Sequence, residues 1–503
     1  MNSAFDPHPI QAVTGLPSYR DSVALIDGAA LFLARTGSGP RLGILAARES
    51  PLRSRFDGEV TESGEQLLSL CRLTHANAVA LREELPWLQP RPLGLRTSAG
   101  CGDRLGLATP GHVRAARQVQ ERSGEPVLGM IFAQQSIREM TRTARTPEQV
   151  LDDATWGTFQ EGWRASVGAD ADHLKTLTDL ERCAAVGYSF FTIDPGEHVD
   201  SGADKAGSQA LLAAFEALPW PQLETTPADL RARYANLRFD LGDRALALDQ
   251  ETLARAGVKY GRAVAHTVRM HRRLVEVRGA RAFELEASVD ETATPTSPAE
   301  HAFIASELKR LGVRWVSLAP RFVGRFEKGV DYIGDLHAFE RDLAAHAAIA
   351  RAMGPYKLSL HSGSDKFSIY PIAEQHAQGL LHLKTAGTSY LEALRALASF
   401  DPALFREILA FAIERYETDR ASYHVSASLQ KVPAPDAPAN AELPNLLEQF
   451  DARQVLHVTF GSVLTSERGF KARLLAGLAA HEEAHYAALQ RHFVRHLQPL
   501  TRV

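Results

Sequence analysis

Four short stretches of this 503-residue chain place histidine, carboxylate and lysine side chains close together. Residues 168–176 read Gly-Ala-Asp-Ala-Asp-His-Leu-Lys-Thr, and residues 190–198 end in Asp-Pro-Gly-Glu-His. Residues 283–287 read Phe-Glu-Leu-Glu-Ala, and residues 361–366 read His-Ser-Gly-Ser-Asp-Lys. A carboxylate beside an imidazole can act as a general acid or base. The two residue types together also suit a divalent first-row metal ion, with Zn2+, Mn2+, Ni2+ and Co2+ all open.

The third stretch, residues 283–287, contains two carboxylates whose negative charge has to be balanced if they are buried. If residues 282–289 form a strand, alternation places Glu284 and Glu286 on the same face. Two carboxylates facing an apolar layer are costly to bury without a cation. A metal ion or a lysine must therefore balance at least one of them.

Each stretch follows a short apolar segment, and eight such segments recur after Pro92. They are residues 93–97, 129–133, 166–169, 189–193, 282–289, 315–319, 356–360 and 380–383. Helical stretches separate most of them, which predicts an α/β protein with a (β/α)8 (TIM) barrel and reactive groups in the loops after the strands. A doubly wound open sheet is the alternative, because strand order cannot be read from sequence.

The barrel is expected over residues 91–400, with additions. Residues 1–90 predict a small N-terminal α/β layer, with strands near 23–26, 30–34 and 41–46 and a helix over 64–85. Residues of about 195–280 form a mostly helical insertion after the fourth strand, and residues 401–503 a mostly helical C-terminal extension. In that extension we expect one more strand at 457–462. Residues 470–497 are then one long solvated helix, available for homo-oligomer contacts, and its H-E-x-x-H at 481–485 is interpreted as surface sequence in preference to a zinc site.

Composition limits the functional classes. The chain is 45% hydrophobic and 23% charged, with a formal net charge of −4 and no basic block, which argues against a nucleic-acid partner. Its three cysteines are far apart, and no apolar run approaches the roughly 20 residues that span a membrane. No G-x-G-x-x-G motif follows a predicted strand, so no nucleotide cofactor is expected. These features predict a cytoplasmic enzyme that acts on a small molecule.

Several of the motifs resemble a known family. Residues 132–140, 168–176, 191–198 and 361–371 resemble the tagaturonate epimerase family of bacterial uronate catabolism, and the similarity extends over most of the chain from about residue 95. The resemblance implies a metal-dependent isomerase of carbohydrate metabolism that interconverts D-tagaturonate and D-fructuronate. Some relatives also act on tagatose and fructose at C4, so a keto-uronate and a neutral ketohexose both remain candidate substrates.

A more distant similarity links the chain to the class II fructose-bisphosphate aldolases, which are also (β/α)8 barrels. Asp172-His173, Ile193-Asp194 and residues 361–364 follow the order of the aldolase motifs. Ser362 stands where those enzymes have glycine, and Asp365-Lys366 follows the turn. This departure fits a substrate that carries no phosphate at that end.

The implied reaction restricts the chemistry. The two keto-uronates differ at a carbinol carbon β to the ketone, whose hydrogen the carbonyl does not acidify. Transient oxidation would need a nicotinamide, for which the chain has no motif. Retro-aldol cleavage, rotation of the aldehyde and re-addition instead need a Lewis acid and a base for the hydroxyl proton.

These considerations give each site residue an expected role. The metal ligands are expected to be His173, Glu286 and His361, with Glu284 or His198 as substitutes. The catalytic candidates are Asp172, Asp194 and Glu284. Substrate contacts are expected from Arg104, Gln134, Gln135, Lys175, His198, Ser362, Ser364, Asp365 and Lys366.

Two of these substrate contacts carry a further expectation. Arg104 or Lys366 would bind the substrate carboxylate, although Arg104 could equally form a structural pair with Asp103. The alternative functions are a class II-type sugar aldolase or ketose isomerase, and a non-catalytic sugar-binding barrel.

Overall fold

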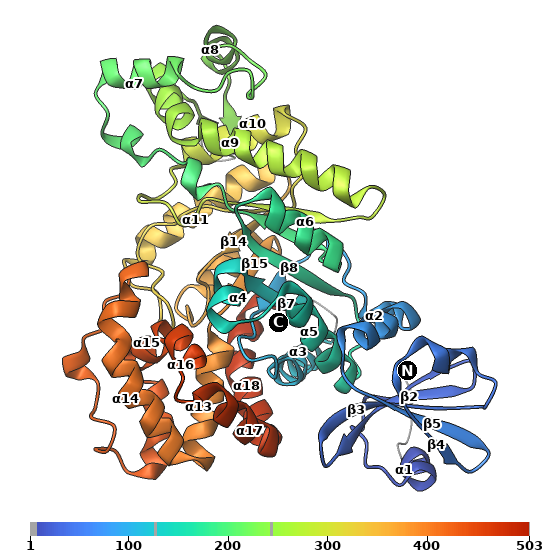
Figure 1. The fold of residues 1–503 in the computed structure, drawn as a ribbon. Helices are drawn as coiled ribbons and strands as arrows, with labels where there is room; N and C mark the ends of the chain where they lie inside the picture. The colour runs from blue at the N-terminus through green and yellow to red at the C-terminus, as the bar shows by residue number, and fades with distance from the viewer. Residues whose placement is uncertain (1–7, 125–127, 242–244, 502–503) are drawn as a thin grey trace.

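The computed structural model describes residues 8–124, 128–241 and 245–501, and a closed barrel of eight parallel strands lies at its centre (Figure 1). The barrel closes where the last strand pairs with the first, with Leu383 opposite Ala99. This closure confirms the (β/α)8 prediction and excludes an open sheet. The strands are β6 (Ser98–Cys101), β7 (Gly129–Ser136), β8 (Val167–Leu174), β9 (Phe190–Ile193), β12 (Glu284–Ser288), β13 (Ser317–Ala319), β14 (Lys357–Leu360) and β15 (Leu381–Thr385).

Seven predicted segments coincide with strands, whereas the first prediction was displaced. The apolar run at 93–97 precedes β6 and packs below the barrel, where the Leu93 side chain lies next to Gly129 and Gly168. The strand itself is built from small residues because the interior is crowded there. A Cβ at Gly100 would lie only 2.7 Å from Oε1 of Gln134.

Helices follow the strands and form the outer wall. Several begin at a Ser or Thr whose side chain accepts the first free backbone N–H, as Ser136, Thr146, Thr176 and Ser297 do. The barrel helices are α3 (Thr109–Ser123), α4 (Ile137–Thr143), α5 (Pro147–Gln160), α6 (Leu177–Val186), α10 (Pro298–Arg310), α11 (Leu336–Met353), α12 (Tyr370–Ala377) and α13 (Thr388–Phe400).

The N-terminal layer is a five-stranded antiparallel sheet in the order β1-β2-β3-β5-β4. The helix predicted over 64–85 was wrong in its first half, because Gly64 adopts φ 62° and turns β4 into β5 as a hairpin. Only residues 75–84 are helical, and the Thr74 side chain caps them. The elements are α1 (His8–Thr14), β1 (Ala24–Ile26), β2 (Ala29–Thr36), β3 (Gly39–Ala46), β4 (Gly58–Ser63), β5 (Gln66–Cys71) and α2 (His75–Glu84).

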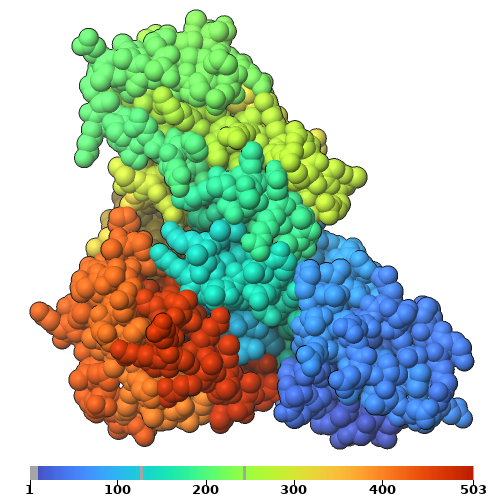
Figure 2. All heavy atoms as spheres, in the orientation of Figure 1, coloured from blue at the N-terminus to red at the C-terminus, as the bar shows by residue number. Residues whose placement is uncertain are grey.

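The insertion after the fourth strand is largely helical, as predicted. It contains α7 (Ser208–Glu216), α8 (Pro227–Ala235), the short pair β10 (Phe239–Asp240) and β11 (Ala245–Leu246), and the 29-residue helix α9 (Gln250–Arg278). Helix α9 packs against α6 and α10, so the insertion covers one flank of the barrel. Figure 2 shows the insertion, the N-terminal layer and the C-terminal helices as three lobes around the barrel.

The C-terminal extension is helical, and two predictions within it were wrong. Residues 457–462 span the junction of two helices and form no strand. The long helix predicted at 470–497 breaks at His481. The second half is not solvated: it packs so closely on α3 that a Cβ at Gly111 would lie 2.5 Å from Cβ of Leu489. The helices are α14 (Pro402–Asp419), α15 (Phe450–Val458), α16 (Phe460–Thr465), α17 (Phe470–Ala480) and α18 (Glu482–Leu497).

Among the residues with described positions, none of the helices combines the length and apolar character that a membrane crossing requires.

Candidate active site

A bulge in β8 brings two consecutive side chains to the same place. The pairing of β8 with β9 shifts between Ala171 and Leu174, and His173 adopts φ 53°. Regular alternation would point Asp172 and His173 to opposite faces, whereas the bulge lets both line one pocket. Nδ1 of His173 donates to Oδ1 of Asp172 at 2.7 Å, which leaves Nε2 directed toward the loop after β12.

Two histidines and a carboxylate meet at the C-terminal end of the barrel. The imidazoles of His173 and His361 lie with their centroids 4.8 Å apart. Asp290 Oδ1 lies 3.5 Å from Nε2 of His173 and 3.0 Å from Nδ1 of His361. One ligand atom from each of the three residues falls within 4.8 Å of the others, a spacing that fits one metal ion.

This arrangement changes the predicted ligand set. His173 and His361 are brought together as expected, but Asp290 completes the triad in the position expected of Glu286. Glu286 is fully buried, and its Oε1 accepts a 2.6 Å hydrogen bond from Nε2 of His361. Its other oxygen, Oε2, is buried without a hydrogen-bond partner among the described residues.

A lysine forms the floor beneath the triad. Nζ of Lys384, at the end of β15, lies 2.7 Å from Asp170, 2.8 Å from Asp172 and 3.0 Å from Glu286. It also donates to the hydroxyl of Thr192 on β9. The demand for a cation beside Glu286 is therefore met by a lysine whose side chain is 3% exposed.

The charges of these groups set one another's protonation. Burial alone would lower the pKa of Lys384, but Asp170, Asp172 and Glu286 outweigh it and raise that pKa well above 10.5. Against the opposing effect of burial, Lys384 and His173 hold the pKa of Asp172 well below 3.8. Asp290 and Glu286 raise the pKa of His361 to about 9 against the same opposition. Both nitrogens of this imidazole face carboxylates, which favours its charged form.

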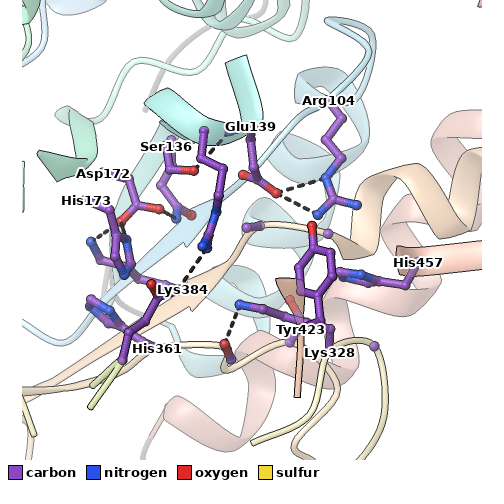
Figure 3. A pocket seen from close by; sticks show the side chains of 18 residues that line it. Arg104, Ser136, Glu139, Asp172, His173, Lys328, His361, Lys384, Tyr423 and His457 are labelled. Carbon is purple, nitrogen blue, oxygen red and sulfur yellow. Dashed lines mark hydrogen bonds and ion pairs between the residues drawn. The ribbon is translucent and has the colours of Figure 1, made fainter. Parts of the chain in front are cut away.

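The triad opens into a hollow on the surface of the barrel mouth. An inner recess of about 40 Å³ is lined by Gln134, Asp172 and Lys384, and it joins an outer hollow of about 370 Å³. Figure 3 shows the histidines on one side of the recess and Arg104, His457 and Lys328 on the other. The pocket therefore has two different ends, with the triad at one and Lys328, His457 and the Arg104–Glu139 pair at the other.

Four predicted contacts lie at this pocket. Ser362 and Ser364 line it through the turn after His361, where Ser362 adopts φ 48°. Nε2 of Gln134 donates to Oδ2 of Asp172 at 3.2 Å. Arg104 also lines the recess, but its guanidinium donates to Oε1 of Glu139 at 2.6 Å and stacks on the ring of Phe460. Its partner is thus Glu139 and not Asp103.

Four other predicted residues lie outside the pocket. Glu284 is at the opposite, N-terminal end of β12, where it accepts a hydrogen bond from the backbone N–H of Gly94. Asp194 accepts from Gly196 and pairs with Lys175 at 3.6 Å. His198 stacks on His266 of the insertion, with centroids 4.2 Å apart. Alternation along the strand explains why Glu284 lies outside the pocket. It shares a face with Glu286 but lies two residues nearer the N-terminal end of the barrel, whereas the pocket is at the C-terminal end.

Three more residues predicted to contact substrate are buried, and their side chains bond to other parts of the protein. Oε1 of Gln135 accepts from Arg145 on the outer face of β7, because its neighbour Gln134 occupies the inner face. The ammonium of Lys366 donates to the backbone carbonyls of Glu327, Val330 and Ser364, so its hydrogens are used. Asp365 pairs with Arg453 at 2.9 Å. None of the three side chains lines the recess.

Asp365 also belongs to a second group of candidate ligands, with His492 and His496 of α18. Nε2 of His496 accepts the backbone N–H of Asp365 at 2.9 Å, and its Nδ1 donates to the carbonyl of His492. The two nitrogens of His492 face Asp365 and Glu392. Every imidazole nitrogen is engaged, so this group ties α18 to the turn after His361. Neither metal-like group in the described residues contains His481 or His485 of the H-E-x-x-H sequence.

Sequence reasoning missed Asp170, Asp290, Lys328 and Lys384. The signal for Lys384 was present, since it directly follows the eighth apolar segment and a metal ion or a lysine was required beside Glu284 or Glu286. Asp290 directly follows the fifth segment, at a strand end where barrel enzymes place reactive groups. Lys328 lies within an irregular loop after β13 and carried no comparable signal.

Comparisons with known proteins identify the family to which the chain is similar. The family model described as tagaturonate epimerase matches residues 19–500. The tagaturonate/fructuronate epimerase of Thermotoga maritima is 42% identical over 486 residues, 97% of each chain. A glycerol-bound crystal structure of fructuronate-tagaturonate epimerase from Cohnella laeviribosi is 36% identical, with a TM-score of 0.89 over 98% of both chains.

The aldolase similarity is much weaker. A fructose-bisphosphate aldolase from Campylobacter jejuni aligns at 12% identity with a TM-score of 0.32, too distant to assign residues. The family model that matches residues 19–500 and the two full-length relatives are all described as tagaturonate epimerases. This chain belongs to the tagaturonate epimerase family.

Proposed function

We propose that this protein interconverts D-tagaturonate and D-fructuronate, with His173, His361 and Asp290 holding a divalent metal ion. Family membership supports the reaction. The observation that supports the centre is the meeting of two imidazoles and a carboxylate at the C-terminal end of the barrel, where such enzymes carry out chemistry.

The donor set fits a metal ion on three grounds. Nε2 of His173 is buried and makes no hydrogen bond among the described residues. Asp172 holds the other nitrogen of that ring, as the outer partners of metal-binding histidines commonly do. Two imidazoles with one carboxylate suit first-row divalent ions, with Zn2+, Mn2+, Ni2+ and Co2+ all compatible. When bound, such an ion supplies a Lewis acid for the ketone oxygen.

Asp172 is the proposed base for the substrate hydroxyl. Among the described residues, Gln134 is the one hydrogen-bond partner of its Oδ2, which faces the recess, while Oδ1 is held by His173 and Lys384. In the retro-aldol direction, the hydroxyl proton on the inverted carbon passes to Asp172 as the bond to the neighbouring carbon breaks. Rotation of the aldehyde and re-formation of that bond on its other face return the proton and give the epimer.

Lys384 and Gln134 contribute by setting the charge and the orientation of the Asp172 carboxylate. The ammonium of Lys384 keeps this carboxylate ionised and fixed, while Gln134 orients the free oxygen. A base with a strongly lowered pKa is weak, so the proton transfer depends on its position and on an acidified hydroxyl. Asp194, which lies outside the pocket, has no part in this scheme.

The test combines metal analysis with turnover. Purified protein should contain one divalent ion per chain and interconvert tagaturonate and fructuronate, with tagatose and fructose turned over more slowly. In D2O, the inverted carbon should retain its hydrogen, since retro-aldol cleavage leaves that C–H bond intact. Deuterium at this carbon would contradict the mechanism, stable three-carbon products would indicate an aldolase, and no turnover of any of the four sugars would contradict the function.

A further inference from the structure

We propose that Lys328 binds the carboxylate of the keto-uronate, in place of Arg104 or Lys366. This inference rests on the proposed function, because it takes a substrate with a carboxylate two carbons beyond the inverted centre. Lys328 lies in the loop between β13 and α11, is half-buried, and lines both the inner recess and the outer hollow.

The first argument is that the other cations around the pocket are already paired with carboxylates. Arg104 is paired with Glu139, Arg138 with Glu291 at 2.9 Å, and Lys384 with three carboxylates. Among the residues with described positions, no carboxylate lies at ion-pairing distance from Lys328. Its ammonium is therefore the cation of the recess that forms no ion pair among the described residues, and the carboxylate that acts on it over a longer distance, Glu291, is itself paired with Arg138.

The second argument is where that ammonium is held. Nζ of Lys328 donates a 2.6 Å hydrogen bond to Oγ of Ser362, the residue after His361. The left-handed backbone of Ser362, at φ 48°, directs this hydroxyl into the pocket. One bond thus fixes the free charge at the turn that follows His361 while leaving two of its three donors for a ligand.

The third argument is the polarity of the recess. Lys328 faces His457 and Arg104 across the end opposite the imidazole triad (Figure 3). Burial and these two cations lower the pKa of His457 well below 6.5, which keeps the imidazole neutral. A ketone at the triad and a carboxylate at Lys328 would match an elongated substrate to the two ends of the pocket.

The test compares Lys328→Met, which keeps length and removes charge, with Lys328→Arg. In Lys328→Met, the KM for tagaturonate should rise about 100-fold or more with little change in kcat, as expected when a contact is equally strong in ground and transition states. Lys328→Arg should recover at least about a tenth of the lost kcat/KM. Metal content should stay at one ion per chain in both variants. The matched control is Lys431→Met, since Lys431 is exposed and lines neither the recess nor the outer hollow.

A second measurement separates charge recognition from a structural role. Competitive inhibition by D-galactonate, which carries a carboxylate, is compared with that by galactitol, which is neutral. Lys328→Met should weaken inhibition by galactonate alone, by about 100-fold, whereas a structural defect weakens inhibition by both probes alike and overturns the assignment.

If Lys328→Met does not fold, the same pair of probes is measured on Lys328→Gln. If wild-type enzyme turns over tagaturonate but either neutral variant keeps its KM within about threefold, the inference fails and the proposed function stands. If wild-type enzyme has no epimerase activity, the proposed function itself fails.

Discussion

The carboxylate of Asp365 accepts a 2.6 Å hydrogen bond from Nε2 of His492, a residue 127 positions further along the chain. The same carboxylate pairs with Arg453 at 2.9 Å. Asp365 itself has a left-handed backbone, at φ 63°, four residues after His361. Side chains from two C-terminal helices, α15 and α18, therefore hold the turn that follows His361 in place.

Asp365→Asn should be strongly destabilising. The change removes the carboxylate charge that pairs with buried Arg453, and breaking a buried pair from one side costs about 3–5 kcal/mol. Chemical denaturation checks this value. The control is Glu407→Gln, which breaks an exposed pair with Arg473 and should cost less than about 1 kcal/mol. A cost for Asp365→Asn as small as that of the control would contradict the role of the pair.

His361→Ala should abolish activity and bound metal together. This imidazole is shared by Asp290 and Glu286, and no other described side chain is placed to replace it in the triad. Metal analysis and turnover measure the two losses. The control is His337→Ala, whose side chain is 86% exposed and which should keep both properties. Stoichiometric metal and a near-normal rate in His361→Ala would exclude the assignment.

Lys384→Met should leave three carboxylates crowded without their cation. We expect a loss of about 3–5 kcal/mol in stability and of most activity, because Asp172 loses the charge that keeps it ionised and in place. Denaturation and turnover at saturating metal check both. If the variant keeps its activity, the ammonium has no part in orienting the base.

Gly387→Ala should disturb the cationic end of the pocket. A Cβ there would lie 1.9 Å from Nε2 of His457, a rigid ring that must move. We expect a loss of about 1–3 kcal/mol from overpacking and a lower kcat/KM for tagaturonate. Gly207→Ala is the control, since nothing lies within 4 Å of its added Cβ. Equal behaviour of the two variants would contradict the close packing on His457.

Asp342→Asn should change how stability depends on pH. Burial raises the pKa of Asp342 to about 6 in the folded protein, above the ordinary 3.8. Between these values the folded state binds more protons than the unfolded state, so wild-type stability should fall as pH rises from about 4 to 6. Relative to wild type, the Asn variant should gain up to about 3 kcal/mol over this window. Denaturation at pH 4 and 7 measures the gain, and a difference that does not change with pH would contradict the raised pKa.

The barrel was predictable because strands buried on both faces are apolar runs bounded by polar turns, as residues 129–133 are. That signal failed at β6, where the crowded interior selects Ser98, Ala99 and Gly100. It also failed at β5, because the leucines at 67, 68 and 70 fit a helical face as readily as a strand. Periodicity alone does not separate short apolar segments of these two kinds.

Parts of the site were predictable for a similar reason, and parts were not. Strand ends pointed to His173 and His361, which the structure brings together. Asp365 and Lys366 were placed in the pocket because local sequence does not say which side of a turn faces a ligand. Their partners, among them Arg453 and His492, lie far along the chain and decide that orientation. The bulge that turns Asp172 and His173 to one side also depends on pairing between strands.

The fastening of the His361 turn by α18 has a consequence for how the protein is made. A ribosome synthesises the eight barrel strands before it reaches the helix that carries His492 and His496. The turn cannot acquire its final support until those last residues have left the exit tunnel. A nascent or prematurely ended chain could thus contain every proposed metal ligand and still lack a finished catalytic centre.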